Sequence, residues 1–91
     1  MTTDYGTVTV TTSATQILAS NPNRKGCIVY NNSSTLILYF GFDSSVTTTN
    51  GMPIPPNSYY YDSGTSDAWR GVIYGIAPSD TINVRYQEWD Q

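Results

Sequence analysis

The chain has 91 residues, of which 12% are charged, and its formal net charge is −3. This length fits one domain, residues 1–91. The cations are Arg24, Lys25, Arg70 and Arg85; they form no basic stripe, so nucleic acid is not an expected partner. The sequence has no histidine and a single cysteine, which excludes Ser-His-Asp and Cys-His sites and an internal disulfide.

The start of the chain, Met1–Asp4, lacks the basic and apolar regions of a signal peptide, and no apolar run approaches the ~20 residues of a membrane helix. We therefore expect synthesis in a cytosol and no membrane partner. Ser, Thr, Asn and Tyr supply much of the polarity, a composition suited to contact with protein or sugar. A chain this small buries only somewhat more than ~60% of its unfolded surface, so neighbouring chains are expected to add stability.

Two short strands are predicted near the start. Residues 5–12 alternate, with Val8 and Val10 on one face and threonines on the other, which is typical of a half-buried strand. Residues 15–19 predict a second strand.

A tight loop is predicted over residues 20–26. Pro22 lies between two asparagines, and Gly26 can adopt a positive φ. Arg24 and Lys25 are therefore expected in an exposed loop.

The most hydrophobic stretch is 27–42. Two apolar and aromatic runs flank the small polar residues 31–34, a pattern that predicts a β-hairpin. We expect its second strand in the middle of a sheet and covered on both sides, because both of its alternating faces are apolar. One face carries Leu36, Leu38, Phe40 and Phe42, and the other carries Ile37 and Tyr39. Cys27 is expected as a buried thiol rather than a nucleophile.

The second half of the chain predicts a proline-rich segment and three further strands. Asn50-Gly51 is a strong turn signal, and the prolines on either side of Ile54 allow only an edge strand or a loop there. Ile54 is expected to plug one end of the core. The further strands are predicted over 59–62, 69–77 and 81–89, the last with Ile82, Val84, Tyr86 and Glu88 on one face.

These elements predict an all-β fold. About 7–8 short strands with turn signals every 8–12 residues are typical of an antiparallel β-sandwich or a jelly-roll-like barrel. No stretch carries a helical period, so little or no helix is expected.

The acidic residues show no catalytic arrangement. All but Glu88 lie in predicted loops or at the termini, where aspartate is an ordinary turn residue, so a glycosidase pair is not expected. Residues 62–67 carry enough oxygens for a calcium loop, but a solvated turn explains them as well. The glycines are isolated and form no phosphate-binding loop. We expect no enzyme, no metal and no cofactor.

The aromatic residues allow two interpretations. Tyr59, Tyr60 and Tyr61 are consecutive, so at least one must point away from the core. Trp69 follows a polar loop, and Trp89 lies near the end of the chain. They form either a contact patch for protein or sugar, or caps on the open ends of a thin sandwich.

The motifs follow one another in a recognisable order over nearly the whole chain. A Thr-Val-Thr-Val strand leads to segments 14–19, 21–26 and 30–34, a strand ending at Gly41, segment 44–51, a proline-containing loop, and segments 71–77 and 82–85. In this order they resemble small β-sandwich virion proteins of tailed bacteriophages, namely capsid decoration (cement) proteins and the capsid-bound bases of head fibres. Similar strings occur in phage tail and baseplate proteins.

The resemblance implies a non-enzymatic protein that lies on the capsid surface of the virion and stabilises the head. Its implied partners are the major capsid protein and its own copies, often as a homotrimer. Residues 1–5 and 88–91 are candidates for arms that order on the shell. The alternative is a tail, baseplate or head-fibre module that binds host surface carbohydrate. The residues we expect at the contact are Tyr59, Tyr60, Tyr61, Trp69 and Trp89, with Arg24 and Lys25 as polar partners.

Overall fold

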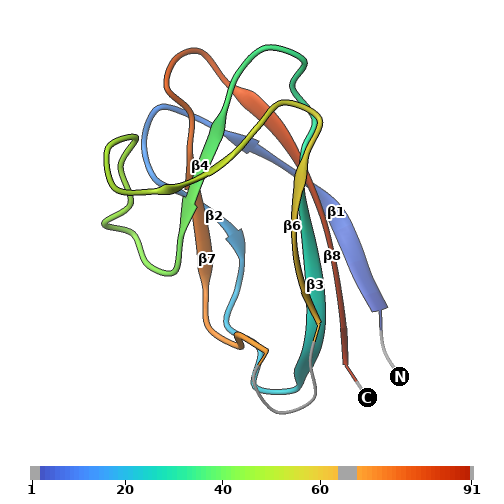
Figure 1. Cartoon of the computed structure of the whole chain (residues 1–91). Coiled ribbons are helices and arrows are strands. Elements are labelled where there is room, and N and C mark those ends of the chain that lie inside the picture. The colour runs from blue at the N-terminus through green and yellow to red at the C-terminus, as the bar shows by residue number, and fades with distance from the viewer. Residues whose placement is uncertain (1–2, 64–67, 91) are drawn as a thin grey trace.

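The computed structural model describes residues 3–63 and 68–90, which form a sandwich of two four-stranded antiparallel sheets (Figure 1). Sheet A contains, in spatial order, β1 (Thr3–Val10), β8 (Ile82–Asp90), β3 (Arg24–Asn31) and β6 (Tyr59–Ser63). Sheet B contains β2 (Thr15–Leu18), β7 (Ile73–Ile76), β4 (Leu38–Gly41) and β5 (Met52–Ile54). The all-β prediction is confirmed. No helix in the described ranges is long and apolar enough to cross a membrane.

The strand pairing is that of a jelly roll. β1 pairs with β8, β2 with β7, β3 with β6 and β4 with β5, all antiparallel. The chain is therefore one long hairpin whose turn connects β4 and β5. The two halves of this hairpin are wound together, so that β8 also pairs with β3 and β7 also pairs with β4. This winding produces the two Greek keys of the jelly roll.

The predicted hairpin over 27–42 is wrong, because β3 and β4 lie in different sheets. After β3 the chain crosses the end of the sandwich, and the buried Asn31 holds this crossing in place. Its Nδ2 donates to the main-chain oxygens of Leu36 at 2.8 Å, Ile54 at 3.0 Å and Pro55 at 3.2 Å. Its Oδ1 accepts from the main-chain N–H of Ser33 at 3.0 Å.

β4 is a central strand, as predicted, but its two faces are not covered equally. Leu38 and Phe40 are buried in the core, whereas Tyr39 and Gly41 on the other face are half-buried. Ile37 and Phe42, which flank the strand, are 37% and 41% exposed. β5, between β4 and solvent, is the predicted proline-containing edge strand, and its Ile54 is buried in the core.

The core lies between the two sheets and follows the period-two pattern of the strands. Burying one of its Val, Leu, Ile or Phe side chains contributes about 1.5–3 kcal/mol. Cys27 and Ile54 belong to this core, as predicted. Its buried members are Val10, Ile17, Leu18, Cys27, Val29, Leu38, Phe40, Ile54, Ile73, Ala77, Ile82 and Val84.

Arg24 and Lys25 begin β3, so the prediction that they lie in an exposed loop is wrong. The register between β3 and β8 shifts between Arg24 and Gly26, which makes Lys25 the extra residue of a β-bulge. Regular alternation from Cys27 would point Arg24 outward. The bulge reverses this, and Arg24 is completely buried.

Gly26 does not use the positive φ that glycine permits. The need for glycine here is steric. A Cβ atom at Gly26 would lie 2.4 Å from Cζ2 of Trp89, whose ring covers this position.

The ends of the described chain pair with each other. Thr3, Asp4 and Tyr5 in β1 face Trp89, Glu88 and Gln87 in β8. The described parts of the candidate arms are residues 3–5 and 88–90. Residues 1, 2 and 91 lie outside the described residues.

Candidate functional site

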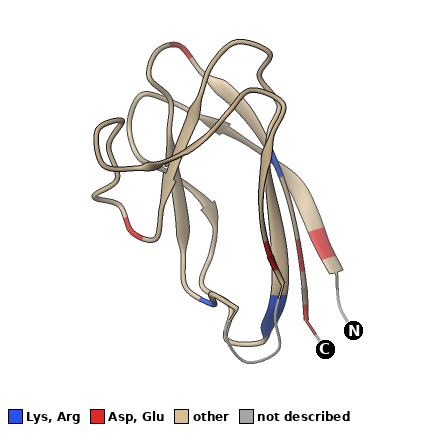
Figure 2. Ribbon diagram, in the orientation of Figure 1, with Lys and Arg blue, Asp and Glu red and all other residues tan. Residues whose placement is uncertain are grey.

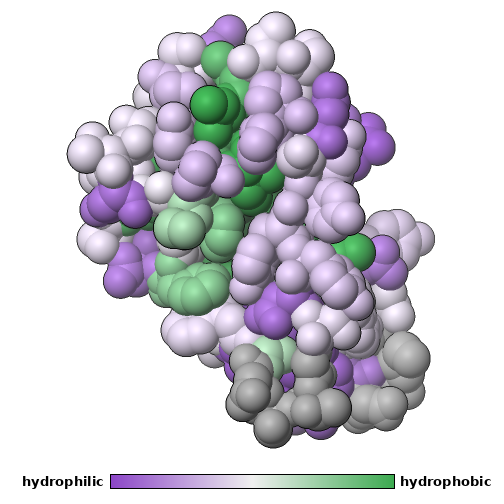
Figure 3. All heavy atoms as spheres, viewed as in Figure 1, coloured by the Kyte–Doolittle hydropathy of each residue, from purple (hydrophilic) through white to green (hydrophobic). Residues whose placement is uncertain are grey.

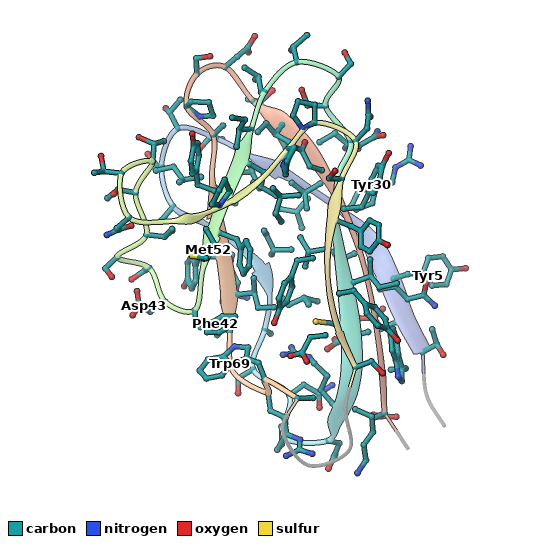
Figure 4. All side chains as sticks on the ribbon, in the orientation of Figure 1. Tyr5, Tyr30, Phe42, Asp43, Met52 and Trp69 are labelled. Atoms are coloured by element: carbon teal, nitrogen blue, oxygen red, sulfur yellow. The ribbon has the colours of Figure 1, made fainter. Side chains whose placement is uncertain are left out.

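Large exposed hydrophobic side chains gather at two places on the molecule. Tyr5, Tyr59 and Tyr61 are 75%, 63% and 55% exposed and belong to sheet A. Phe42 and Met52 are 41% and 61% exposed and lie beside β4 on the other side of the molecule. Figure 4 shows Tyr5 and Tyr30 on the outer side of sheet A, whereas Phe42 and Met52 lie beside β4, with Trp69 next to Phe42.

The outer face of sheet A presents aromatic side chains in adjacent rows. The strand register places Tyr5, Gln87, Ile28 and Tyr61 in one row, and Thr7, Arg85, Tyr30 and Tyr59 in the next. Trp89 lies beside Tyr61, with ring centroids 6.3 Å apart. We call this surface the tyrosine face and define it by Tyr5, Ile28, Tyr30, Tyr59, Tyr61 and Trp89.

The sequence predicted only part of the tyrosine face. Tyr59, Tyr61 and Trp89 were expected as contact residues, and the structure places them together. Tyr5, Ile28 and Tyr30 were missed, because their place on this face depends on pairing between strands far apart in the sequence. One local signal was available, since Ile28 and Tyr30 alternate with the buried Cys27 and Val29.

The second place is a groove of about 550 Å³ at the mouth of the sandwich. Phe40 and Val46 form its buried side, and Phe42 and Met52 its exposed side. In Figure 3, hydrophobic surface gathers on the β4 side of the view. The groove is lined by Phe40, Gly41, Phe42, Asp43, Ser45, Val46, Asn50, Gly51, Met52 and Tyr60.

Two of the predicted contact residues, Tyr60 and Trp69, lie at this groove rather than on the tyrosine face. The ring of Tyr60 lies 4.7 Å from that of Phe40, and Trp69 stacks on Phe42 at 4.3 Å with a 12° interplanar angle. Both residues are half-buried and bonded to Asp62. The Tyr60 hydroxyl and the Trp69 main-chain N–H donate to its Oδ2 at 3.2 Å and 2.9 Å. Two effects raise the pKa of Tyr60 to about 12: burial of the phenol, which is the larger, and the adjacent Asp62 carboxylate. The phenol therefore stays protonated.

Arg24 ties β3 to β8 and to the segments that follow β2 and precede β7, at the opposite end of β3 from Asn31. Its Nε donates to Oε1 of Glu88 at 2.8 Å. Its Nη1 donates to the main-chain oxygens of Trp69 and Gly71, and its Nη2 to that of Ala19 at 2.6 Å. A side chain enclosed in this way is structural and does not reach a partner. Lys25, the other predicted cation, is half-buried at the bulge.

We expect the thiol of Cys27 to be unreactive in the folded protein. Burial raises the pKa of this thiol from 9.0 to about 11, although Arg24 nearby opposes the rise. An aromatic disulfide reagent should therefore modify Cys27 only as fast as the domain opens. Because the folded-state pKa is raised, the protonated thiol contributes stability below pH 9 that is lost as the pH approaches about 11. Fast, stoichiometric modification of the folded chain would contradict this prediction.

The described residues do not bring acidic groups together for metal chemistry. Within 3–63 and 68–90, no three or more His, Cys, Asp or Glu side chains are placed to hold a metal ion. The calcium loop considered for 62–67 lies mostly outside the described residues, and Asp62 itself bonds to Tyr60 and Trp69.

Comparisons with protein-family models, curated proteins and solved structures found no match to this chain. The function is accordingly inferred from the tyrosine face, the groove and the residues around them.

Proposed function

We propose that this protein is a non-enzymatic phage decoration protein that binds the assembled capsid through the tyrosine face and stabilises the head. The observation that carries this proposal is the exposure of three tyrosines on one rigid sheet face, at 55% to 75% each. Tyrosine supplies a large contact area with few rotatable bonds, and it is enriched where protein surfaces meet. The proposed partners are the major capsid protein and further copies of this chain.

The composition of the tyrosine face favours burial against protein. Arg85 is the one charged residue in its two central rows, so little charge would have to be desolvated. Many copies on one shell also allow weak single contacts to sum to firm attachment. Jelly rolls occur in viral capsid and lectin domains, although a fold by itself does not decide a function.

The geometry also favours a second candidate, a tail, baseplate or head-fibre module that binds carbohydrate. Tyr5 and Tyr61 stand at the two ends of one row, three strand spacings or roughly 14 Å apart. Gln87 lies between them and can hydrogen-bond a sugar hydroxyl. Two exposed rings with a polar group between them suit stacking against an extended glycan.

Replacing Tyr61 with serine should weaken binding to undecorated phage heads about 30-fold, the effect of losing one well-packed aromatic anchor. The native protein should bind these heads at micromolar concentration and raise their melting temperature. Met52→Ser is the matched control, because it removes a similarly exposed side chain from the groove and should leave head binding unchanged. Both variants should fold normally, since exposed substitutions usually change stability by about 0.5 kcal/mol or less.

A glycan array separates the two candidate functions. Failure of the native protein to associate with heads would reject the decoration proposal. Glycan binding that disappears in Tyr61→Ser, without head binding, would establish the carbohydrate module instead.

A further inference from the structure

The groove at the mouth of the sandwich is a binding surface separate from the tyrosine face. Its volume of about 550 Å³ lies in the usual range of ligand pockets. Phe42 and Met52 leave apolar surface uncovered along its exposed side. An occupant that supplies an apolar group would bury this surface, which is the main favourable contribution to such binding.

The groove is preformed by contacts within the chain. Stacking on Trp69 fixes the ring of Phe42, and the Tyr60 ring packs on Phe40. The loop over 43–51 is held by its own hydrogen bonds. Asn50 Oδ1 accepts from the N–H of Thr47, Asn50 Nδ2 donates to the main-chain oxygen of Ser45, and the N–H of Gly51 donates to the main-chain oxygen of Thr47. Little conformational freedom would be lost on binding.

The charge that the described residues bring to the groove is negative. Among the described residues that line it, Asp43 is the only charged one, and in Figure 2 the loop after β4 carries acidic and no basic colour. Asp43 Oδ1 accepts from the main-chain N–H and hydroxyl of Ser45 at 2.9 Å and 2.6 Å, which lowers the pKa of Asp43. Among the described residues no donor bonds to Oδ2. The Ser45 hydroxyl and both amide atoms of Asn50 are already used within the loop, so few polar groups remain for a sugar.

We propose that the groove binds a peptide segment of a partner protein in which an apolar side chain is followed by Lys or Arg. The apolar side chain lies between Phe42 and Met52, and the cation meets the carboxylate of Asp43. Charge complementarity selects this occupant, because the lining that the structure describes carries a carboxylate and no cation. The inference does not depend on the proposed capsid function, since the groove and the tyrosine face are separate surfaces that are tested with different partners.

NMR titration of the full chain with three capped peptides tests the proposal. The peptides are acetyl-Gly-Phe-Lys-Gly-amide, its Phe-Glu counterpart and its Ala-Lys counterpart. The Phe-Lys peptide should shift the amide signals of residues 40–52 and bind at least about fivefold more tightly than the Phe-Glu peptide, the effect of one exposed charge pair. The Ala-Lys peptide should bind more weakly than Phe-Lys, because it buries no ring.

Two variants assign the effect to the groove. Asp43→Asn keeps an oxygen for the Ser45 bonds and should remove the preference for Lys over Glu. Met52→Ser should weaken both phenylalanine peptides, while Tyr61→Ser should change neither. Equal binding of the Phe-Lys and Phe-Glu peptides, signal shifts confined to the tyrosine face, or no binding of any peptide would overturn the proposal.

Discussion

Arg24→Met is expected to lower the free energy of unfolding by about 3–5 kcal/mol, the usual effect of removing one partner of a buried ion pair. The substitution leaves Glu88 without its charge partner, although the Glu88 side chain is only 14% exposed. It also removes the donors to three main-chain oxygens, of Ala19, Trp69 and Gly71. Urea unfolding followed by tryptophan fluorescence measures the change.

Arg85→Met is the matched control for this prediction. Arg85 is exposed on the outer face of sheet A, so its replacement should change stability by about 0.5 kcal/mol or less. Adding Glu88→Gln to Arg24→Met should restore part of the loss, because a neutral amide is easier to bury than an unpaired carboxylate. Small domains have a free energy of unfolding of only about 5–15 kcal/mol, so Arg24→Met alone should be marginally stable at room temperature. A loss below about 1 kcal/mol would show that the pair is not structural.

The strands were predictable because alternation is a local property. Val8 and Val10, or Ile82 and Val84, reveal their core-facing side within a few residues. Arg24 was misplaced for a different reason, because Pro22, the two asparagines beside it and Gly26 indicated a loop. In the structure β3 begins at Arg24, and the bulge at Lys25 turns this side chain inward. The sequence did contain a signal for a buried cation, namely the position of Glu88. It shares a face with Ile82, Val84 and Tyr86, and a buried acid in a chain with four cations requires one of them as a partner.

The topology was not predictable from the local pattern. Two apolar runs separated by a short polar loop are typical of a hairpin, but β3 and β4 belong to different sheets. In a jelly roll the pairing partners are remote, as with β1 and β8, so the sequence between two strands says little about whether they pair. The same reason explains the tyrosine face. Tyr59 and Tyr61 were visible as neighbours in sequence, whereas Tyr5 joins them only through β8 and β3.

Both open ends of the sandwich are closed by a polar side chain of β3. Arg24 bonds to main-chain oxygens at one end, and Asn31 does so at the other. A buried polar group is stable only when its hydrogen bonds are satisfied, and both residues satisfy this condition with main-chain oxygens. All of these oxygens except that of Ile54 belong to residues outside the strands. β3 therefore fixes the loops at both ends and, between them, supplies Ile28 and Tyr30 to the tyrosine face. Loss of either end residue should disturb binding only through the fold.

Asn31→Leu is expected to lower the free energy of unfolding by about 3 kcal/mol, because buried main-chain groups lose their partner. The side chain is completely buried, and its amide bonds to three main-chain oxygens and one main-chain N–H. The nearby Asn32→Leu is the control. Asn32 is exposed, so its replacement should have little effect on urea unfolding.

Asn31→Asp distinguishes a hydrogen-bonding role from simple packing. The introduced carboxyl would face three carbonyl oxygens in a buried site, which favours its protonated form and raises its pKa in the folded state. Its protonated form therefore contributes stability at low pH that is lost as the pH rises through the folded-state pKa. The variant should be much less stable than the native chain near pH 7 and approach it near pH 4, where carboxyl groups protonate. The Asn31→Leu loss should not depend on pH in this way. If the Asp variant shows a deficit that is equally independent of pH, Asn31 fills space at this end of the sandwich and does not hold the crossing from β3 to β4 by its hydrogen bonds.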